Sequence, residues 1–147
     1  MNDLLQMEHM SQGSAYSLLD TSLPLSKEKN MEAVSRQSMI VYQLLELVHR
    51  HYADSNISLN TIARHKLYMN PDYLGKVFKR ITGIGFSQYL NQYRIQQACS
   101  YMRHKDKDAK IFELAESFGF GRNPQYFSQV FKKWTGVTPS DYRSRAK

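Results

Sequence analysis

The sequence predicts an all-α fold of about seven helices, in which two helix-turn-helix units are joined by a long central helix. Two stretches read almost alike, NPDYLGKVFKRITG at 70–83 and NPQYFSQVFKKWTG at 123–136, and they start 53 positions apart (123 − 70). Between them, residues 86–103 carry apolar side chains at helical spacing and no Gly or Pro. We therefore expect one unit to occur twice, with a single helix as the connection.

The first unit is expected at about 39–84, and two helices precede the repeated stretch. Apolar residues between Ile40 and Tyr52 recur at steps of one, three and four, which predicts a helix over about 39–53. Ser58 is the candidate N-cap of a short second helix. The repeated stretch would then form the third helix of the unit.

Each copy of the repeated stretch carries the start and stop signals of a helix. Asn70 and Asn123 can cap a helix through their side-chain oxygens, and the proline that follows fits the first helical position. A glycine closes each copy. Apolar residues inside each copy share one stripe, so one side is expected to pack and the other to face solvent or a ligand.

The connecting helix is expected over about 86–103 and the second unit over about 108–145. At about 1.5 Å per residue, the connecting helix would span roughly 27 Å. After the polar stretch HKDKDAK the earlier order returns, with a short helix around Leu114, the turn GFGR and the second copy. A last short helix is expected from Thr138.

The charge of the chain favours an acidic partner such as nucleic acid or an anionic surface. The formal net charge is +7 over 147 residues. Positions 1–38 hold three basic and five acidic side chains, so the remaining 109 residues carry +9. Positions 1–37 are rich in Ser, Gln and Asn, and we expect them to form a linker or a flexible N-terminal arm.

Enzyme, metal and membrane functions find little support. The single cysteine excludes a disulfide framework within the chain and a cysteine-based zinc site, and the five histidines show no metal-ligand spacing. We therefore predict no catalytic residue, no metal and no cofactor. No stretch approaches the roughly 18 apolar residues that a membrane span needs, and no signal-peptide pattern opens the sequence. The expected location is the cytoplasm, with no membrane partner.

A helix-turn-helix can place one helix in the major groove of B-DNA, which is about 12 Å wide. Two such helices on a connector of roughly 27 Å could reach successive major grooves about 34 Å apart, if side chains, helix offset or DNA bending covers the difference. The pairs Lys79-Arg80 and Lys132-Lys133 recur at equivalent places, which favours DNA contact over a merely solvated basic face.

Three further side chains have two interpretations each. Arg94 lies on the connecting helix next to Ile95, where we expect an ion-paired structural arginine rather than a DNA contact. Tyr73 and Tyr126 occupy the same position in the two copies. They fit either the rim of the core or a hydroxyl donor to phosphate.

Over about 40–145 these residues resemble the AraC/XylS family of bacterial transcription regulators. The second unit, IFELAESFGFGRNPQYFSQVFKKWTGVTPSDYR, is similar to the family signature built on I-A, G-F, Y-F, F-K-K, G-x-x-P and Y-R. The first unit looks most like the version at the C-terminus of two-component response regulators. The resemblance implies sequence-specific binding of double-stranded promoter DNA and activation of transcription through RNA polymerase.

Family members usually carry another domain, either a sensor for a sugar-like effector or a phosphoacceptor receiver. Positions 1–37 are too short for either, so we expect this chain to be the output part of a longer regulator, with a stand-alone regulator as the alternative.

The resemblance also implies which side chains meet DNA. It assigns base-edge contacts to Asp72, Gly75, Lys76, Gln125, Ser128 and Gln129. It places near the DNA backbone Asn70, Tyr73, Lys79, Arg80, Asn123, Tyr126, Lys132 and Lys133. Gln can pair with adenine, Lys can donate to guanine and Asp can accept from cytosine.

Gly75 departs from this pattern because it brings no side chain to a reading position. The first unit could therefore mainly grip phosphates, or allow a close approach of its backbone. Two other functions stay open, namely non-specific nucleic-acid binding and a protein-interaction module that retains the fold.

Overall fold

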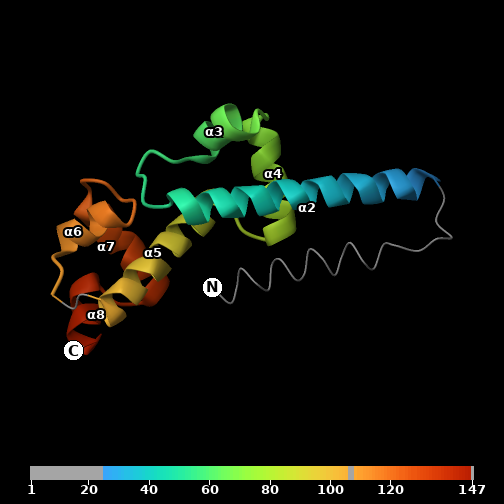
Figure 1. The fold of residues 1–147 in the computed structure, drawn as a ribbon. Coiled ribbons are helices and arrows are strands. Elements are labelled where there is room, and N and C mark those ends of the chain that lie inside the picture. Colours follow the sequence, from blue (N-terminus) through green and yellow to red (C-terminus); the bar gives the residue numbers. More distant parts are fainter. Residues whose placement is uncertain (1–24, 106–107, 147) are drawn as a thin grey trace.

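The computed structural model describes residues 25–105 and 108–146, and within them it contains seven α-helices, one π-helical turn and no strand (Figure 1). The predicted all-α fold is confirmed. The elements are α2 Leu25–His51, α3 Leu59–Ile62, the π-helical turn η1 Ala63–Leu67, α4 Pro71–Thr82, α5 Phe86–His104, α6 Ile111–Ser117, α7 Pro124–Thr135 and α8 Pro139–Ala146.

Two hydrophobic clusters share α5 as their common wall. The first cluster combines residues of α2, α3 and α4 with the N-terminal half of α5, up to Tyr93. The second combines α6 and α7 with the C-terminal half of α5, from Ile95 onward. Figure 1 shows α3 and α4 near one end of α5, and α6, α7 and α8 around the other. The connecting helix is therefore part of both cores.

Helix α2 begins at Leu25, so the predicted start near residue 39 is wrong. Among residues 30–51 of α2, the fully buried ones lie between Val41 and Val48. Residues 30–40 are half-buried or exposed. That stretch therefore lacks the apolar stripe from which a helix is recognised in sequence. Of the predicted linker or arm at 1–37, residues 25–37 are helical and residues 1–24 lie outside the described residues.

The two copies of the repeated stretch fold alike, and their predicted caps are confirmed. The side-chain oxygens of Asn70 and Asn123 each accept a hydrogen bond from the amide three positions on, at 3.1 Å in both copies. Gly83 and Gly136 close the helices with φ of 85° and 84°. The N–H of each glycine donates at 2.8 Å to the carbonyl four residues earlier. Local chemistry thus fixes both ends of α4 and α7.

The turns that lead into α4 and α7 differ. Ser58 caps α3 as predicted, in a capping box with Thr61. The chain then makes the π-helical turn η1 and ends it at Tyr68, which has a left-handed backbone at φ 53°. In the second unit glycines take the left-handed positions, at Gly119 and Gly121. Glycine adopts this conformation without the steric penalty that a side chain meets.

The connecting helix α5 ends one residue beyond its predicted end at 103. Its 19 residues correspond to about 28 Å at 1.5 Å per residue. No helix in the described part of the chain is both long enough and apolar enough to cross a membrane.

Candidate nucleic-acid interface

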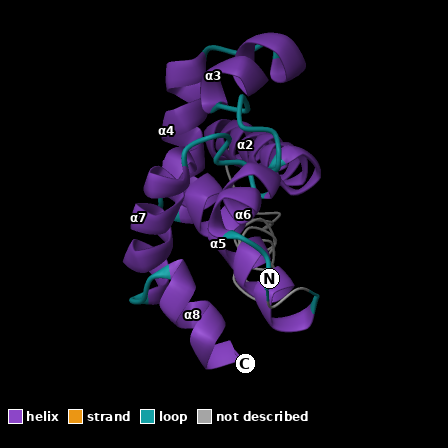
Figure 2. Ribbon diagram, turned by 90° about the vertical axis from the view of Figure 1, so that its left-hand side faces the viewer, coloured by secondary structure: helices purple, strands orange, loops and turns teal. Residues whose placement is uncertain are grey.

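Helices α4 and α7 lie along the same edge of the molecule, on the left of Figure 2. Helix α5 lies nearer the middle of this view. Each buries one stripe, formed in α4 by Leu74, Val77 and Phe78 and in α7 by Phe127, Val130 and Phe131. The opposite face of each helix is turned to solvent. Two exposed helix faces on one side are the geometry that a pair of helix-turn-helix units offers to a DNA duplex.

The residues assigned to base edges lie on these two exposed faces. Asp72, Lys76, Gln125 and Gln129 are exposed, whereas Gly75 and Ser128 are half-buried. The structure therefore brings together three of the six on α4 and three on α7. Their contacts with bases stay a prediction.

The basic residues assigned to the DNA backbone lie at the C-terminal ends of the same helices. Lys79, Arg80, Lys132 and Lys133 are all exposed. Among residues 30–105 and 108–145, whose side chains the structure describes, the ion pairs within 4.0 Å are Arg36–Glu32 and Arg122–Glu116, and neither includes a residue of α4 or α7. Because no carboxylate in this part of the chain neutralises them at that distance, these four cations can attract phosphate.

Tyr73 and Tyr126 lie at the surface, at 46% and 45% exposure. The hydroxyl of Tyr73 accepts a hydrogen bond from Nε2 of Gln37 at 3.2 Å. The hydroxyl of Tyr126 accepts one from Nδ2 of Asn91 at 3.1 Å. In each unit the helix that precedes the helix-turn-helix holds this tyrosine in place. Since the hydroxyl accepts in both cases, its own hydrogen can still be donated to a phosphate.

Gln37 contacts the predicted DNA-binding face, and nothing in the sequence indicates this role. Besides its bond to Tyr73, its side-chain oxygen accepts from Nη2 of Arg80. The two partners are 36 and 43 positions away along the chain. No local pattern signals a contact of this range. Helix α2 thereby touches two of the residues predicted to lie near the DNA backbone.

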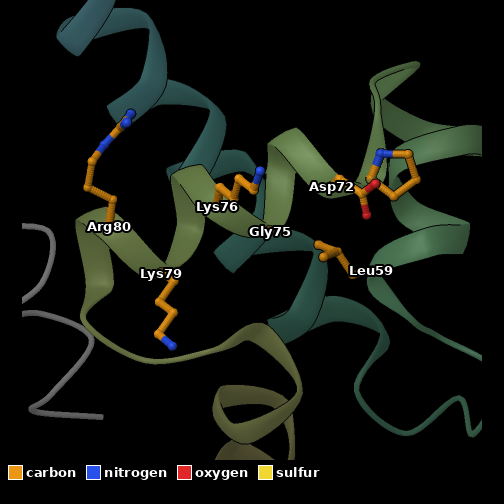
Figure 3. A pocket seen from close by; sticks show the side chains of 7 residues that line it. Leu59, Asp72, Gly75, Lys76, Lys79 and Arg80 are labelled. Carbon is orange, nitrogen blue, oxygen red and sulfur yellow. The ribbon is translucent and has the colours of Figure 1, made fainter.

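An open groove of about 660 Å³ runs along the exposed face of α4. Its lining consists of Leu59 from α3, of Pro71, Asp72, Gly75 and Lys76, and of Lys79 and Arg80. Figure 3 shows Leu59 beside Gly75 at one end of the groove, near Asp72, and Arg80 at the other end. A Cβ atom at Gly75 would lie 3.0 Å from Cδ2 of Leu59. The glycine therefore sets how closely α3 approaches α4.

In the second unit, the hollow that includes the base-edge residue Gln129 lies in a different place. A cavity of about 270 Å³ lies between α5 and α7, lined by Ser87, Gln88, Asn91, Tyr126, Gln129, Val130, Lys133 and Trp134. In the first unit the groove is bounded by the preceding short helix, and in the second by the connecting helix. The two exposed faces therefore differ in shape as well as in side chains.

Arg94 joins the two units from inside, at 7% exposure. Its Nε donates to the carbonyl of Tyr52 at 2.8 Å and its Nη2 to the carbonyl of Asp54 at 2.9 Å. The guanidinium carbon lies 5.8 Å from the ring centre of Phe120 in the second unit. Burial lowers the pKa of Arg94, and the Asp54 carboxylate opposes this shift. Arg94 is thus a structural arginine, as expected, but its hydrogen bonds go to carbonyls and not to the predicted ionic partner.

Among the described residues, no three His, Cys, Asp or Glu side chains are grouped closely enough to hold a metal ion.

Comparison with known proteins gives the same architecture. The sequence profile described as "Helix-turn-helix domain" matches residues 62–145. The chain is 44% identical over 108 residues to the uncharacterized transcriptional regulatory protein YesN of Bacillus subtilis, which covers 74% of this chain and 29% of that protein. The chain therefore spans less than a third of the length of this relative.

Two solved structures resemble this fold. One is the C-terminal domain of AraT, a response regulator from Geobacillus stearothermophilus, with a TM-score of 0.67 and 31% identity over 72% of this chain and 84% of that one. The other is the C-terminal domain of the two-component response regulator yesN from Fusobacterium nucleatum. It has a TM-score of 0.64 and 32% identity over 69% of this chain and 95% of that one.

Proposed function

Because the chain belongs to the AraC-type family of helix-turn-helix domains, which are domains of transcriptional regulators and not enzymes, we propose that it binds promoter DNA sequence-specifically with α4 and α7. The two helices enter successive major grooves of one duplex. The observation that carries this proposal is the placement of two exposed helix faces, with basic C-terminal ends, along one edge of the molecule.

In this proposal the two helices divide base reading and phosphate contact along their length. Asp72 and Lys76 on α4, and Gln125 and Gln129 on α7, reach base edges. Gln suits adenine, Lys suits guanine and Asp suits the amino group of cytosine. The lysines and Arg80 near the helix ends meet phosphates, and such contacts supply affinity without sequence information.

The same proposal places the chain in a longer regulator that acts in the cytoplasm. It rests on two findings, namely that the chain spans 29% of the YesN relative and that both solved relatives are C-terminal domains of response regulators. Phosphorylation of a receiver domain elsewhere in the protein would then control DNA binding. Activation of transcription through contact with RNA polymerase is the expected outcome at the promoter.

Titrations of specific and random DNA at several salt concentrations test the proposal. Gln129→Ala should lose about 1–3 kcal/mol of discrimination at one base position and leave binding to random DNA unchanged. Lys132→Ala should weaken both DNAs alike and flatten the salt dependence by about one unit of slope. Lys105→Ala removes an exposed lysine outside α4 and α7 and serves as the control.

Equal losses on specific and random DNA for Gln129→Ala would contradict the base-reading assignment. If the unmodified protein bound random competitor DNA as tightly as any selected sequence, it would be a non-specific nucleic-acid-binding protein. If it bound neither, the fold would serve as a protein-interaction module.

A further inference from the structure

The end of the α4 groove at Gly75 is lined differently from the rest of it. Asp72, Lys76, Lys79 and Arg80 surround the groove with charge. At Gly75 there is no side chain, and the apolar Leu59 from α3 lies directly beside the helix backbone (Figure 3). Leu59 thus fills the place that a Cβ atom at Gly75 would take, since its Cδ2 would lie 3.0 Å from that atom, and it forms a small apolar patch within an otherwise charged reading face.

Only one base offers an apolar group in the major groove. Thymine carries a C5-methyl group there, whereas the edges of adenine, guanine and cytosine present hydrogen-bond donors and acceptors. A charged side chain at position 75 would occupy the space that such a methyl group needs. An apolar patch formed by Leu59 can take the methyl out of water by ordinary van der Waals contact.

We propose that the apolar patch formed by Leu59 at Gly75 binds the C5-methyl group of one thymine, so that the first unit reads this base by apolar contact. The proposal rests on the proposed function, because it requires α4 to lie in the major groove. Gly75 then becomes a specificity-determining position even though it brings no side chain.

The neighbours of Gly75 support a reading role for this part of α4. Asp72 precedes Gly75 by one helical turn and Lys76 follows it directly, and both are exposed. They can bind the amino group of a cytosine and the acceptors of a guanine on either side of the thymine. The methyl contact would fix the register of these two polar contacts.

The second unit has Ser128 at the equivalent position, where a side chain with a hydroxyl replaces the bare backbone. The hollow beside α7 that includes Gln129 is formed with α5 and not with the preceding short helix. We therefore assign the methyl contact to the first half-site.

Replacing single thymines with deoxyuridine in a selected binding site tests the proposal, because the two bases differ only by the methyl group. The first half-site is identified as the half in which Lys76→Ala relaxes the base preference. Removing one methyl contact should weaken binding about fourfold at one thymine of this half-site. Deoxyuridine at the other thymines should have little effect.

Gly75→Ser covers the apolar patch with the side chain that the second copy carries. Its Cβ would meet the end of the flexible Leu59 side chain at 3.0 Å, and serine is a better helix former than glycine, so the variant should fold. The ratio of thymine to deoxyuridine affinity should fall from about four to about one. Leu59→Ala, which removes the apolar wall, should lower the same ratio. Lys105→Ala, which lies outside α4 and α7, is the control and should leave the ratio unchanged.

Equal affinity for thymine and deoxyuridine at every position, or an unchanged ratio in both Gly75→Ser and Leu59→Ala, would overturn the inference. A protein that shows no preference for the selected site over random DNA would refute the proposed function instead. The two failures are therefore distinguishable in one set of titrations.

Discussion

Helix α4 and helix α7 start from the same asparagine cap and end at the same left-handed glycine, and yet the surfaces beside them differ. The caps agree at 3.1 Å and the closing glycines at φ of 85° and 84°. The groove of the first unit is bounded by α3 and that of the second by α5. The two units share the residues that cap and close the helices, and they differ at the positions assigned to base edges.

The junction between the units is the place where one substitution should do most damage. A Cβ at Gly119 would lie 2.2 Å from the carbonyl oxygen of Tyr52 and 2.3 Å from Nε of Arg94. We expect Gly119→Ala to lower the free energy of unfolding by about 4 kcal/mol, as measured by urea denaturation. Gly83→Ala and Gly136→Ala meet no atom within 4 Å and should lose only about 1 kcal/mol, from the backbone strain. A loss at Gly119 no larger than at Gly136 would show that the junction is loose.

Arg94→Met should have the next largest effect. The variant keeps an apolar side chain against Phe120 but removes the guanidinium donors from the carbonyls of Tyr52 and Asp54. Of these two carbonyls, that of Asp54 keeps another donor, the N–H of Ile57 at 3.3 Å. We expect a loss of about 2–3 kcal/mol in the free energy of unfolding. Arg94→Lys, which can serve one of the two carbonyls, should lose less. A change below about 0.5 kcal/mol in Arg94→Met would mean that water replaces the guanidinium without penalty.

The two asparagine caps test whether α4 and α7 depend equally on their N-terminal hydrogen bonds for stability. Asn70→Ala and Asn123→Ala should each lower the free energy of unfolding by about 1 kcal/mol. Because the hydrogen bonds have equal lengths, the two losses should agree within a few tenths of a kcal/mol. Clearly unequal losses would indicate that the surrounding unit, and not the cap, sets the stability of one helix.

The smallest change in stability and DNA affinity is expected for substitutions in the helix that precedes each helix-turn-helix. Gln37→Ala releases Tyr73 and Arg80, and the exposed site should change stability by less than about 0.5 kcal/mol. DNA affinity should change by no more than about twofold, equally for specific and random sequences, because phosphate contacts carry no sequence information. Asn91→Ala releases Tyr126 and is the matched variant in the second unit. A change of base preference in either variant would contradict a purely positioning role.

Features that rest on local chemistry were predictable from the sequence. The caps at Asn70 and Asn123, the connecting helix and the all-α fold follow from residue types at short spacing. The start of α2 was not predictable, since residues 30–40 are held without a fully buried apolar stripe. The partners of Gln37 and Arg94 were also hidden, because they lie 36 to 43 positions away along the chain.

The candidate site was predictable as two exposed faces, but its shape was not. Gly75 stands out in the sequence as a departure from the expected pattern. Its meaning depends on Leu59, which reaches it from α3. Whether a missing side chain leaves open space or is filled by a neighbour depends on the adjacent helix, and at Gly75 the neighbour is Leu59. This is why the sequence left open whether the first unit reads bases at all.

The central claim is that one frame, used twice, reads two unlike half-sites. Selection of bound sequences from a random DNA pool tests it most directly, with the unmodified protein, Lys76→Ala and Gln129→Ala in parallel. We predict two different half-motifs about one helical turn apart, with each variant altering the preference in one half only. A single motif, two identical halves, or variants that alter the same positions would contradict the account.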